Sequence, residues 1–376
     1  MQADHAPHPA APPLDPMLAD LEELVTCESY SADHEAVARS ARVVAAQGAR
    51  LLGAAPETIV TGGVTHLRWS FGTPRTLLLG HHDTVWPMGT LKTHPFSVEQ
   101  GIARGPGVFD MKAGLVQMFH GLAQLPSLDG ICVLVTGDEE VGSETSRALI
   151  EEAARACRAS LVLEAAAAGG ALKTCRKGVS NYQLTVRGRA AHAGLEPEKG
   201  INAAIDLAHH LLALQDITDA VTARTGPGTT ITPTVLSAGT ATNTVPAGAE
   251  LSIDVRVPSP AAQQAVHDLI TALRPHHPDA GLRIDGGPNR PPLDADASKD
   301  LFALASETAA RLGMDALQQA AVGGASDGNY TAGVGCPTLD GLGAVGDGAH
   351  ADHEHVVTAA MPVRAQLLTH LLGAMP

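Results

Sequence analysis

The chain has 376 residues, of which 44% are hydrophobic, and its 40 acidic and 25 basic residues give a formal net charge of −15. This length predicts two domains rather than one core. The acidic balance disfavours nucleic acid as a partner, and no apolar run is long enough to cross a membrane. The five cysteines contain no CxxC pair, so neither a disulfide framework nor a zinc ribbon is expected.

The first sixteen residues, MQADHAPHPAAPPLDP, are rich in proline and alanine. They lack the basic start and apolar core of a secretory signal. We therefore expect residues 1–16 to be a disordered lead-in and the protein to be cytoplasmic. Helical spacing follows over residues 17–52, and two short strands are expected within 58–70.

The stretch LLLGHHDTV, residues 77–85, contains the first candidate for chemistry. A short apolar run that ends at glycine predicts a buried strand. Side chains on a strand alternate between faces, so His81 and Asp83 point one way and His82 the other. A strand-end histidine followed by a carboxylate is a metal-ligand arrangement, because the carboxylate can fix the tautomer of the imidazole. We favour His81 as the ligand, with His82 as the alternative.

Further carboxylates follow the next elements in the chain. Glu139 and Glu140 come after the apolar run 131–136, Glu164 follows a strand over 160–163, and Asp110 closes a glycine-rich loop over 86–109. Helices are expected at 112–125 and 145–158. Alternating strands and helices predict a doubly wound α/β domain with a central, mostly parallel sheet, whose ligands gather beyond the carboxyl ends of the strands. Asp110 could instead cap the helix that follows it.

The pattern changes after residue 177. A strand–helix–strand–strand–helix–strand order predicts a small ferredoxin-like α+β domain inserted at 178–287. The catalytic domain would then comprise residues 17–177 and 288–376. Helices 298–312 and 358–374 belong to it. So do the glycine-rich loops GGASDGNY (323–330) and GAVGDGAH (343–350), each of which is expected to follow a short strand. The expected elements of the insert are strands at 180–188, 229–237, 248–257 and 281–285 and helices at 200–214 and 260–273.

Several carboxylates in one crevice repel each other unless a counter-charge is present, and one or two divalent metals supply it. Asp110 suits a bridging role, and His350 of GDGAH offers a second imidazole. Mixed histidine and carboxylate donors favour Zn²⁺ or another first-row metal over Mg²⁺ or Ca²⁺. Of the neighbours Glu139 and Glu140, one would bind metal and the other would act as general base.

Along the chain, in this order, stand the motifs GHHDTV, RGPGVFDMKAG and TGDEEVGS, the residue Glu164, and the motifs RAAHAG, NTVP, DVRV, GGASDGNY and GDGAH. This combination resembles the aminoacylase and glutamate carboxypeptidase family of co-catalytic di-zinc metallopeptidases, and within it the branch of folate-cleaving glutamate carboxypeptidases. The resemblance implies two Zn²⁺ per subunit, with Co²⁺ or Mn²⁺ as substitutes. It assigns the metal ligands His81, Asp110, Glu140, Glu164 and His350. Asp110 would bridge, Glu139 would be the general base and Asp83 would orient His81.

The resemblance also gives roles to the inserted domain, which would be a lid and would form a homodimer. His192 would reach the partner subunit's active site and stabilise an oxyanion, and Asn243 and Arg256 would bind a substrate carboxylate. Ser326 of GGASDGNY is either a turn residue or a substrate contact.

The function that we expect is zinc-dependent hydrolysis of an amide bond next to a free α-carboxylate. The substrate would be an N-acyl amino acid or small peptide, and the product a C-terminal amino acid, glutamate-like by analogy. An N-acyl-amino-acid deacylase or a dipeptidase of the same family is the first alternative. A binding homologue that has lost the chemistry is the second.

Overall fold

The structure, a computed structural model, describes residues 10–375, which form two compact units. The second unit comprises Arg176–Asp294 and Gly323–Ala325, and the rest of the described chain forms the first. Most of the expected disordered lead-in, residues 1–9, lies outside the described residues. The expected C-terminal end of this lead-in, residue 16, is corrected, because helix α1 already begins at Leu14. Among the described residues, no helix combines the length and apolarity needed to span a membrane.

A six-stranded sheet forms the centre of the first unit. Its strand order is β1-β2-β6-β3-β7-β14, in which β6, β3, β7 and β14 run parallel and β2 runs antiparallel to β6. The fully buried strands β3 and β6 are the apolar runs before His81 and before the two glutamates. The strands are β1 Glu57–Thr61, β2 Val64–Ser70, β3 Thr76–His81, β6 Ile131–Thr136, β7 Ala159–Val162 and β14 Thr338–Leu339.

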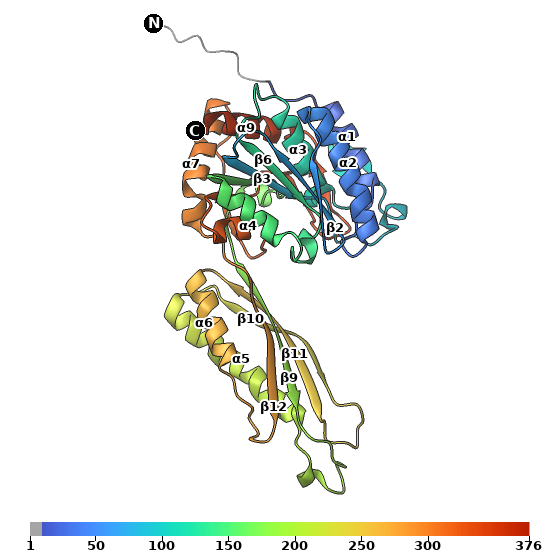
Figure 1. Ribbon diagram of the computed structural model, residues 1–376, viewed down its shortest axis with the longest axis vertical. Coiled ribbons are helices and arrows are strands. Elements are labelled where there is room, and N and C mark those ends of the chain that lie inside the picture. The colour runs from blue at the N-terminus through green and yellow to red at the C-terminus, as the bar shows by residue number, and fades with distance from the viewer. Residues whose placement is uncertain (1–9, 376) are drawn as a thin grey trace. The chain divides into compact units, whose positions relative to one another are not determined.

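Helices cover both faces of this sheet (Figure 1). Leu78 faces a core that it shares with α1, α2, α3, α7 and α9, whereas Leu77 and Leu79 face a second core with α4 and α8. This alternation is the doubly wound arrangement predicted from the sequence, which is confirmed. The helices are α1 Leu14–Thr26, α2 His34–Leu52, α3 Ala113–Leu122, α4 Arg147–Ala156, α7 Ala295–Arg311, α8 Gly328–Gly333 and α9 Ala360–Ala374.

Further short strands lie in segments to which the sequence analysis assigned no strand, apart from β13, which lies where a short strand was expected before GGASDGNY. They form a small sheet of order β15-β16-β5-β4 and a separate pair, β13 with β8. Runs of two to five residues are too short to show a period, so sequence patterns miss most of them. These strands are β4 Ser97–Glu99, β5 Ile102–Arg104, β8 Leu172–Arg176, β13 Gln319–Val322, β15 Gly346–Asp347 and β16 His355–Val357.

The second unit has the predicted ferredoxin-like element order. Its antiparallel sheet, β10-β11-β9-β12, buries alternate residues against helices α5 and α6. The strand β12 continues through Gly286-Gly287-Pro288, which the sequence had placed at its end. An edge strand tolerates proline, and the register shifts after Pro288. The elements are β9 Gly178–Arg187, α5 Ala203–Thr225, β10 Thr230–Ala238, β11 Gly248–Val257, α6 Pro260–Thr271 and β12 Gly281–Arg290.

The close approach of α3 to the end of β7 depends on Gly114, since a Cβ there would collide with the carbonyl oxygen of Leu163. Gly114→Ala should lower the free energy of unfolding by about 1–3 kcal/mol, the usual cost of overpacking. Gly373→Ala in α9 is the control, because its Cβ would meet no heavy atom within 4 Å. That variant should be neutral or gain up to about 1 kcal/mol. Urea unfolding followed by circular dichroism measures both, and equal stabilities would contradict the close packing.

Candidate metal centre

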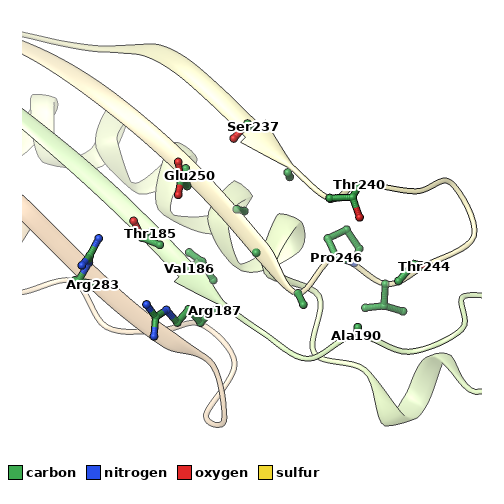
Figure 2. Close-up of a pocket in the computed structure, with 16 residues that line it drawn as sticks. Thr185, Val186, Arg187, Ala190, Ser237, Thr240, Thr244, Pro246, Glu250 and Arg283 are labelled. Atoms are coloured by element: carbon green, nitrogen blue, oxygen red, sulfur yellow. The ribbon is translucent and has the colours of Figure 1, made fainter.

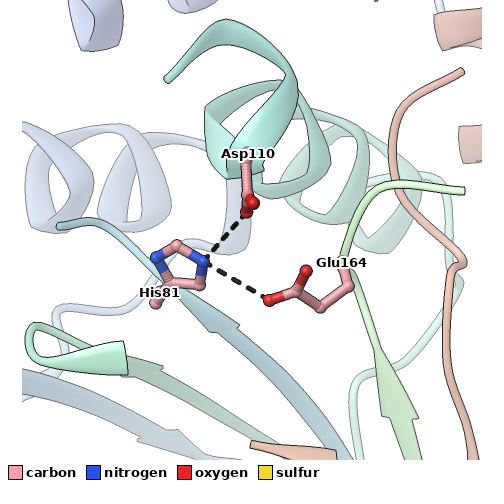
Figure 3. A group of neighbouring side chains, drawn as sticks. All are labelled: His81, Asp110 and Glu164. Atoms are coloured by element: carbon pink, nitrogen blue, oxygen red, sulfur yellow. Dashed lines mark hydrogen bonds and ion pairs between the residues drawn. The ribbon is translucent and has the colours of Figure 1, made fainter. Parts of the chain in front are cut away.

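His81 is the last residue of β3, and its buried ring faces two carboxylates. Its Nε2 atom lies 3.3 Å from Oδ1 of Asp110 and 3.4 Å from Oε1 of Glu164. Figure 3 shows the three side chains converging from separate segments of the first unit. One imidazole nitrogen and two carboxylate oxygens at this spacing form a group that could hold a metal ion.

A second group shares Asp110 with the first. Nε2 of His350 lies 3.4 Å from Oδ2 of Asp110 and 3.0 Å from Oε2 of Glu140. These three residues also form a group that could hold a metal ion. His350 adopts φ 64°, a left-handed conformation that is uncommon for residues other than glycine and concentrates at functional sites.

The parallel strands explain why residues so far apart in sequence meet. His81 ends β3, Glu139 and Glu140 form a short helical turn just after β6, and Glu164 follows β7 by two residues. Because these strands are parallel neighbours, their carboxyl ends share one edge of the sheet. The structure therefore brings together the five residues that we expected to be metal ligands.

Asp83 connects His81 to the turn that carries the two glutamates. Its carboxylate is completely buried and lies 3.3 Å from Nδ1 of His81. It also accepts the backbone N–H groups of Glu139 and Glu140, each at 3.2 Å, and the hydroxyl of Ser31 at 2.7 Å. Asp83 therefore contacts His81 directly, as its expected orienting role requires. Its hydrogen bonds to the turn that carries Glu139 and Glu140 were not expected from the sequence.

Glu354 was not singled out in the sequence, although it contacts the loop that carries Asp110. Its buried carboxylate accepts N–H groups from Gly107, Phe109, Asp110 and the Trp86 ring. The surrounding stretch ADHEH has several polar residues and no periodic pattern, so no signal in the sequence distinguishes this glutamate from its neighbours.

Burial and the contacts between imidazoles and carboxylates shift the pKa values of the candidate ligands. Burial raises the pKa of Glu140 to about 7 despite its contact with His350. Hydrogen bonds to Asp110 and Glu140 raise the pKa of His350 to about 10. Burial opposes a charge on His81, yet its contacts with Asp110, Asp83 and Glu164 hold its pKa well above the ordinary value. Burial likewise opposes a charge on Asp110, but the two imidazoles lower its pKa.

These contacts fit a pair of cations. Nε2 of each imidazole faces two carboxylate oxygens, so a positive charge has to lie between them, either as a proton on the ring or as a metal ion. Nδ1 of His81 lies 3.0 Å from the carbonyl oxygen of Asp83, so a hydrogen on Nδ1 can be donated to that oxygen. In this tautomer the lone pair of Nε2 is free to bind a metal ion. The mixed nitrogen and oxygen donors suit a first-row divalent metal.

The structure separates His82 and Ser326 from this cluster. His82 points away from His81, its Nε2 atom lies 3.1 Å from the carbonyl oxygen of Thr65, and burial lowers its pKa to about 4. Ser326 is completely buried, and its hydroxyl donates to Asp340 and accepts from the N–H of Gly328. Of the two roles expected for Ser326, the substrate contact is therefore corrected. Its buried hydroxyl forms internal hydrogen bonds with Asp340 and Gly328 instead.

The remaining expected residues lie in the second unit. His192 and Asn243 are exposed on two adjacent loops, joined by a hydrogen bond from the Ala193 N–H to the Asn243 carbonyl. Nδ1 of His192 accepts local backbone N–H groups, which makes Nε2 the donor in the neutral ring. Arg256 lies eight residues beyond the start of β11, roughly 26 Å along the strand. Its guanidinium pairs with Asp254 at 2.8 Å.

A hollow of about 590 Å³ borders the His192 and Asn243 loops (Figure 2). Arg187 and Arg283 lie on its β9 and β12 side, and Thr244 and Pro246 lie at its loop end. Its lining contains one carboxylate, Glu250, and no histidine or cysteine, so it does not offer the donor set of a metal site.

Comparison with known proteins identifies the family. Residues 77–374 match the model of peptidase family M20/M25/M40. The chain belongs to this family. Carboxypeptidase G2 from Pseudomonas sp. (strain RS-16) is 30% identical over 95% of this chain and 88% of that protein. Succinyl-diaminopimelate desuccinylase from Wolinella succinogenes is 25% identical over 79% of this chain and 83% of that protein.

Solved structures of M20 peptidases share the fold. The M20 metallo-carboxypeptidase Sso-CP2 from Sulfolobus solfataricus aligns with a TM-score of 0.74 at 16% identity, over 95% of this chain and 98% of that one. A Bacillus subtilis protein described as a dinuclear metal-binding M20 peptidase aligns with a TM-score of 0.62 at 14% identity, over 95% and 96%. The resemblance inferred from the motifs is confirmed, and membership of this family makes the chain a hydrolase of peptide or amide bonds.

The two adjacent histidines give a matched test of the metal centre. His81→Ala should weaken zinc binding by at least about 10-fold, because it removes a donor that faces two carboxylates. His82→Gln should leave zinc binding within about 2-fold, because an amide can still donate to the Thr65 carbonyl. Equilibrium dialysis with elemental analysis measures both variants. Stronger loss of zinc in the His82 variant would contradict the assignment.

Proposed function

We propose that the chain is a zinc-dependent hydrolase of an amide bond next to a free α-carboxylate. It would release a C-terminal, glutamate-like amino acid from an N-acyl amino acid or small peptide. The observation that carries the proposal is the pair of donor groups that share Asp110, with the buried Glu139 beside the ligand Glu140. The similarity to carboxypeptidase G2 over 95% of the chain supports this substrate class.

His81 and Glu164 would hold one Zn²⁺, Glu140 and His350 the other, and Asp110 both. When bound, two such ions supply positive charge that polarises the scissile carbonyl and acidifies the attacking water. Glu139 accepts the proton of that water as it attacks and then passes the proton to the leaving amine. Asp83 holds the backbone of Glu139 in place through the 3.2 Å hydrogen bond to its N–H group.

Substrate recognition is proposed to come from the second unit. Arg256 offers a planar fork suited to a carboxylate, and Asn243 an amide. His192 would donate from Nε2 to the developing oxyanion. His192 and Asn243 lie at the opposite end of β11 from Arg256, which supports a homodimer in which one subunit supplies Arg256 and its partner the other two. A cytoplasmic location is part of the same proposal.

An N-acyl-amino-acid deacylase is the second candidate, and the similarity to succinyl-diaminopimelate desuccinylase favours it. The two candidates differ in which side of the amide bond is recognised. A panel of N-acyl-glutamates, other N-acyl amino acids, N-succinyl-diaminopimelate and unblocked dipeptides separates them by kcat/KM. We expect N-acyl-glutamates to be the best substrates. Fastest turnover of N-succinyl-diaminopimelate or of the other N-acyl amino acids would support the second candidate, and fastest turnover of unblocked dipeptides would indicate a dipeptidase instead of either.

Glu139→Gln tests the general base. The variant keeps the size of the side chain and the backbone contact to Asp83 but cannot accept a proton, so kcat should fall by about 10²–10⁴-fold. Zinc content should stay at the wild-type value, because Glu139 is not among the proposed ligands. Chelator should abolish wild-type activity, and added Zn²⁺ should restore it. Wild-type activity that survives complete metal removal would refute the metal mechanism.

Arg256→Lys tests carboxylate recognition. Loss of the two-pronged contact should raise KM for an N-acyl-glutamate by about 10-fold or more with a smaller effect on kcat. Arg283→Lys is the control, because Arg283 forms a similar pair with Asp285 two residues away on β12. Its KM should match that of the wild type. An unchanged KM in the Arg256 variant would remove this residue from the proposed recognition site.

A further inference from the structure

Both oxygens of the Glu354 carboxylate accept hydrogen bonds from loops of the first unit. Oε1 accepts the backbone N–H groups of Phe109 at 2.8 Å and Asp110 at 3.0 Å. Oε2 accepts the Gly107 N–H at 2.9 Å and the indole N–H of Trp86 at 2.7 Å. A buried carboxylate with two N–H donors on each oxygen is well satisfied, and its position is therefore tightly defined.

The segments that meet at Glu354 are those that carry the candidate metal ligands. Asp110 is itself one of the hydrogen-bond donors, and it is shared by both donor groups. His350 lies four residues before Glu354, and backbone hydrogen bonds from Ala351 to Gly348 and from Glu354 to Ala351 fold the chain between them. Trp86 follows Asp83, the partner of His81, by three residues.

The Glu354 carboxylate thus joins three segments through one group, and the turn Val108–Lys112 has no side-chain N-cap of its own. We propose that Glu354 is a positioning residue that sets the spacing between Asp110 and His350 and thereby the affinity of the centre for its second metal ion. The inference rests on the metal centre of the proposed function, but not on the identity of the substrate. Glu354 binds neither metal nor substrate in this account.

Glu354→Gln is the sharpest substitution, because it keeps the size of the side chain. One oxygen becomes an NH₂ group, so in either orientation of the amide two N–H donors of the loops would face another donor. Glu354→Asp keeps both oxygens and the charge but is one methylene shorter. Glu28→Gln is the matched control, because Glu28 also accepts backbone N–H groups, those of Gly89 and Leu91, at the short turn Thr90–Lys92, which contains no candidate ligand.

The experiment titrates Zn²⁺ and Co²⁺ into the metal-free full-length protein and its three variants. Calorimetry gives the affinity of each step, and the visible absorption of Co²⁺ reports the coordination geometry. Metal-free samples are compared by circular dichroism and thermal unfolding, and the titrations are run well below every midpoint. We expect Glu354→Gln to bind the second ion about 10–100-fold more weakly, with an altered Co²⁺ spectrum. Glu354→Asp should recover part of that affinity, and Glu28→Gln should bind as the wild type does.

The outcomes separate this inference from the proposed function. If the wild type binds two ions and Glu354→Gln binds both with unchanged affinity and spectrum, Glu354 does not position the ligands, even if the variant unfolds at a lower temperature. If Glu28→Gln loses as much affinity as Glu354→Gln, the effect is a general one of loop stability and the inference is wrong. If the wild type binds no metal at all, the proposed function fails first.

Discussion

The candidate metal centre depends on the hydrogen bonds that the buried carboxylate of Asp83 accepts. A completely buried charge is costly unless it is hydrogen-bonded, and Asp83 is surrounded by donors from the His81 ring, the glutamate turn and Ser31. Together with the Asp83 carbonyl oxygen, 3.0 Å from Nδ1, the carboxylate fixes the Nδ1 side of His81, so its Nε2 side faces the other ligands. One residue therefore orients a ligand from β3 and the turn after β6.

The fold adds a second constraint, which is the convergence of like charges. Parallel strands place His81, Glu140 and Glu164 along one edge, and the 107–110 loop inserts Asp110 among them. Burial raises the pKa of Glu140, and the neighbouring Asp110 carboxylate adds to that rise, so the negative charge of this cluster is unfavourable without a nearby cation. Bound metal cations would compensate this charge, so the features that make the site unfavourable in isolation are those that suit it to metal.

Much of the site could be predicted because it follows from periodicity and strand order. Alternation along β3 distinguished His81 from His82, and the apolar runs predicted which acidic residues would follow buried strands. The role of Glu354 could not be predicted, because it arises from contacts with residues more than 240 positions away in the chain. Ser326 failed for a related reason: GGASDGNY was expected to be a loop, but α8 begins within it at Gly328, and a carboxylate fourteen residues later accepts the serine hydroxyl.

The most direct test of the two-metal centre is a crystal structure of the zinc-loaded protein with anomalous scattering measured at the zinc absorption edge. The account predicts two anomalous peaks in each first unit, both in contact with Asp110. One should also contact His81 and Glu164, and the other Glu140 and His350. A single peak, or peaks that do not share Asp110, in fully zinc-loaded protein would contradict it.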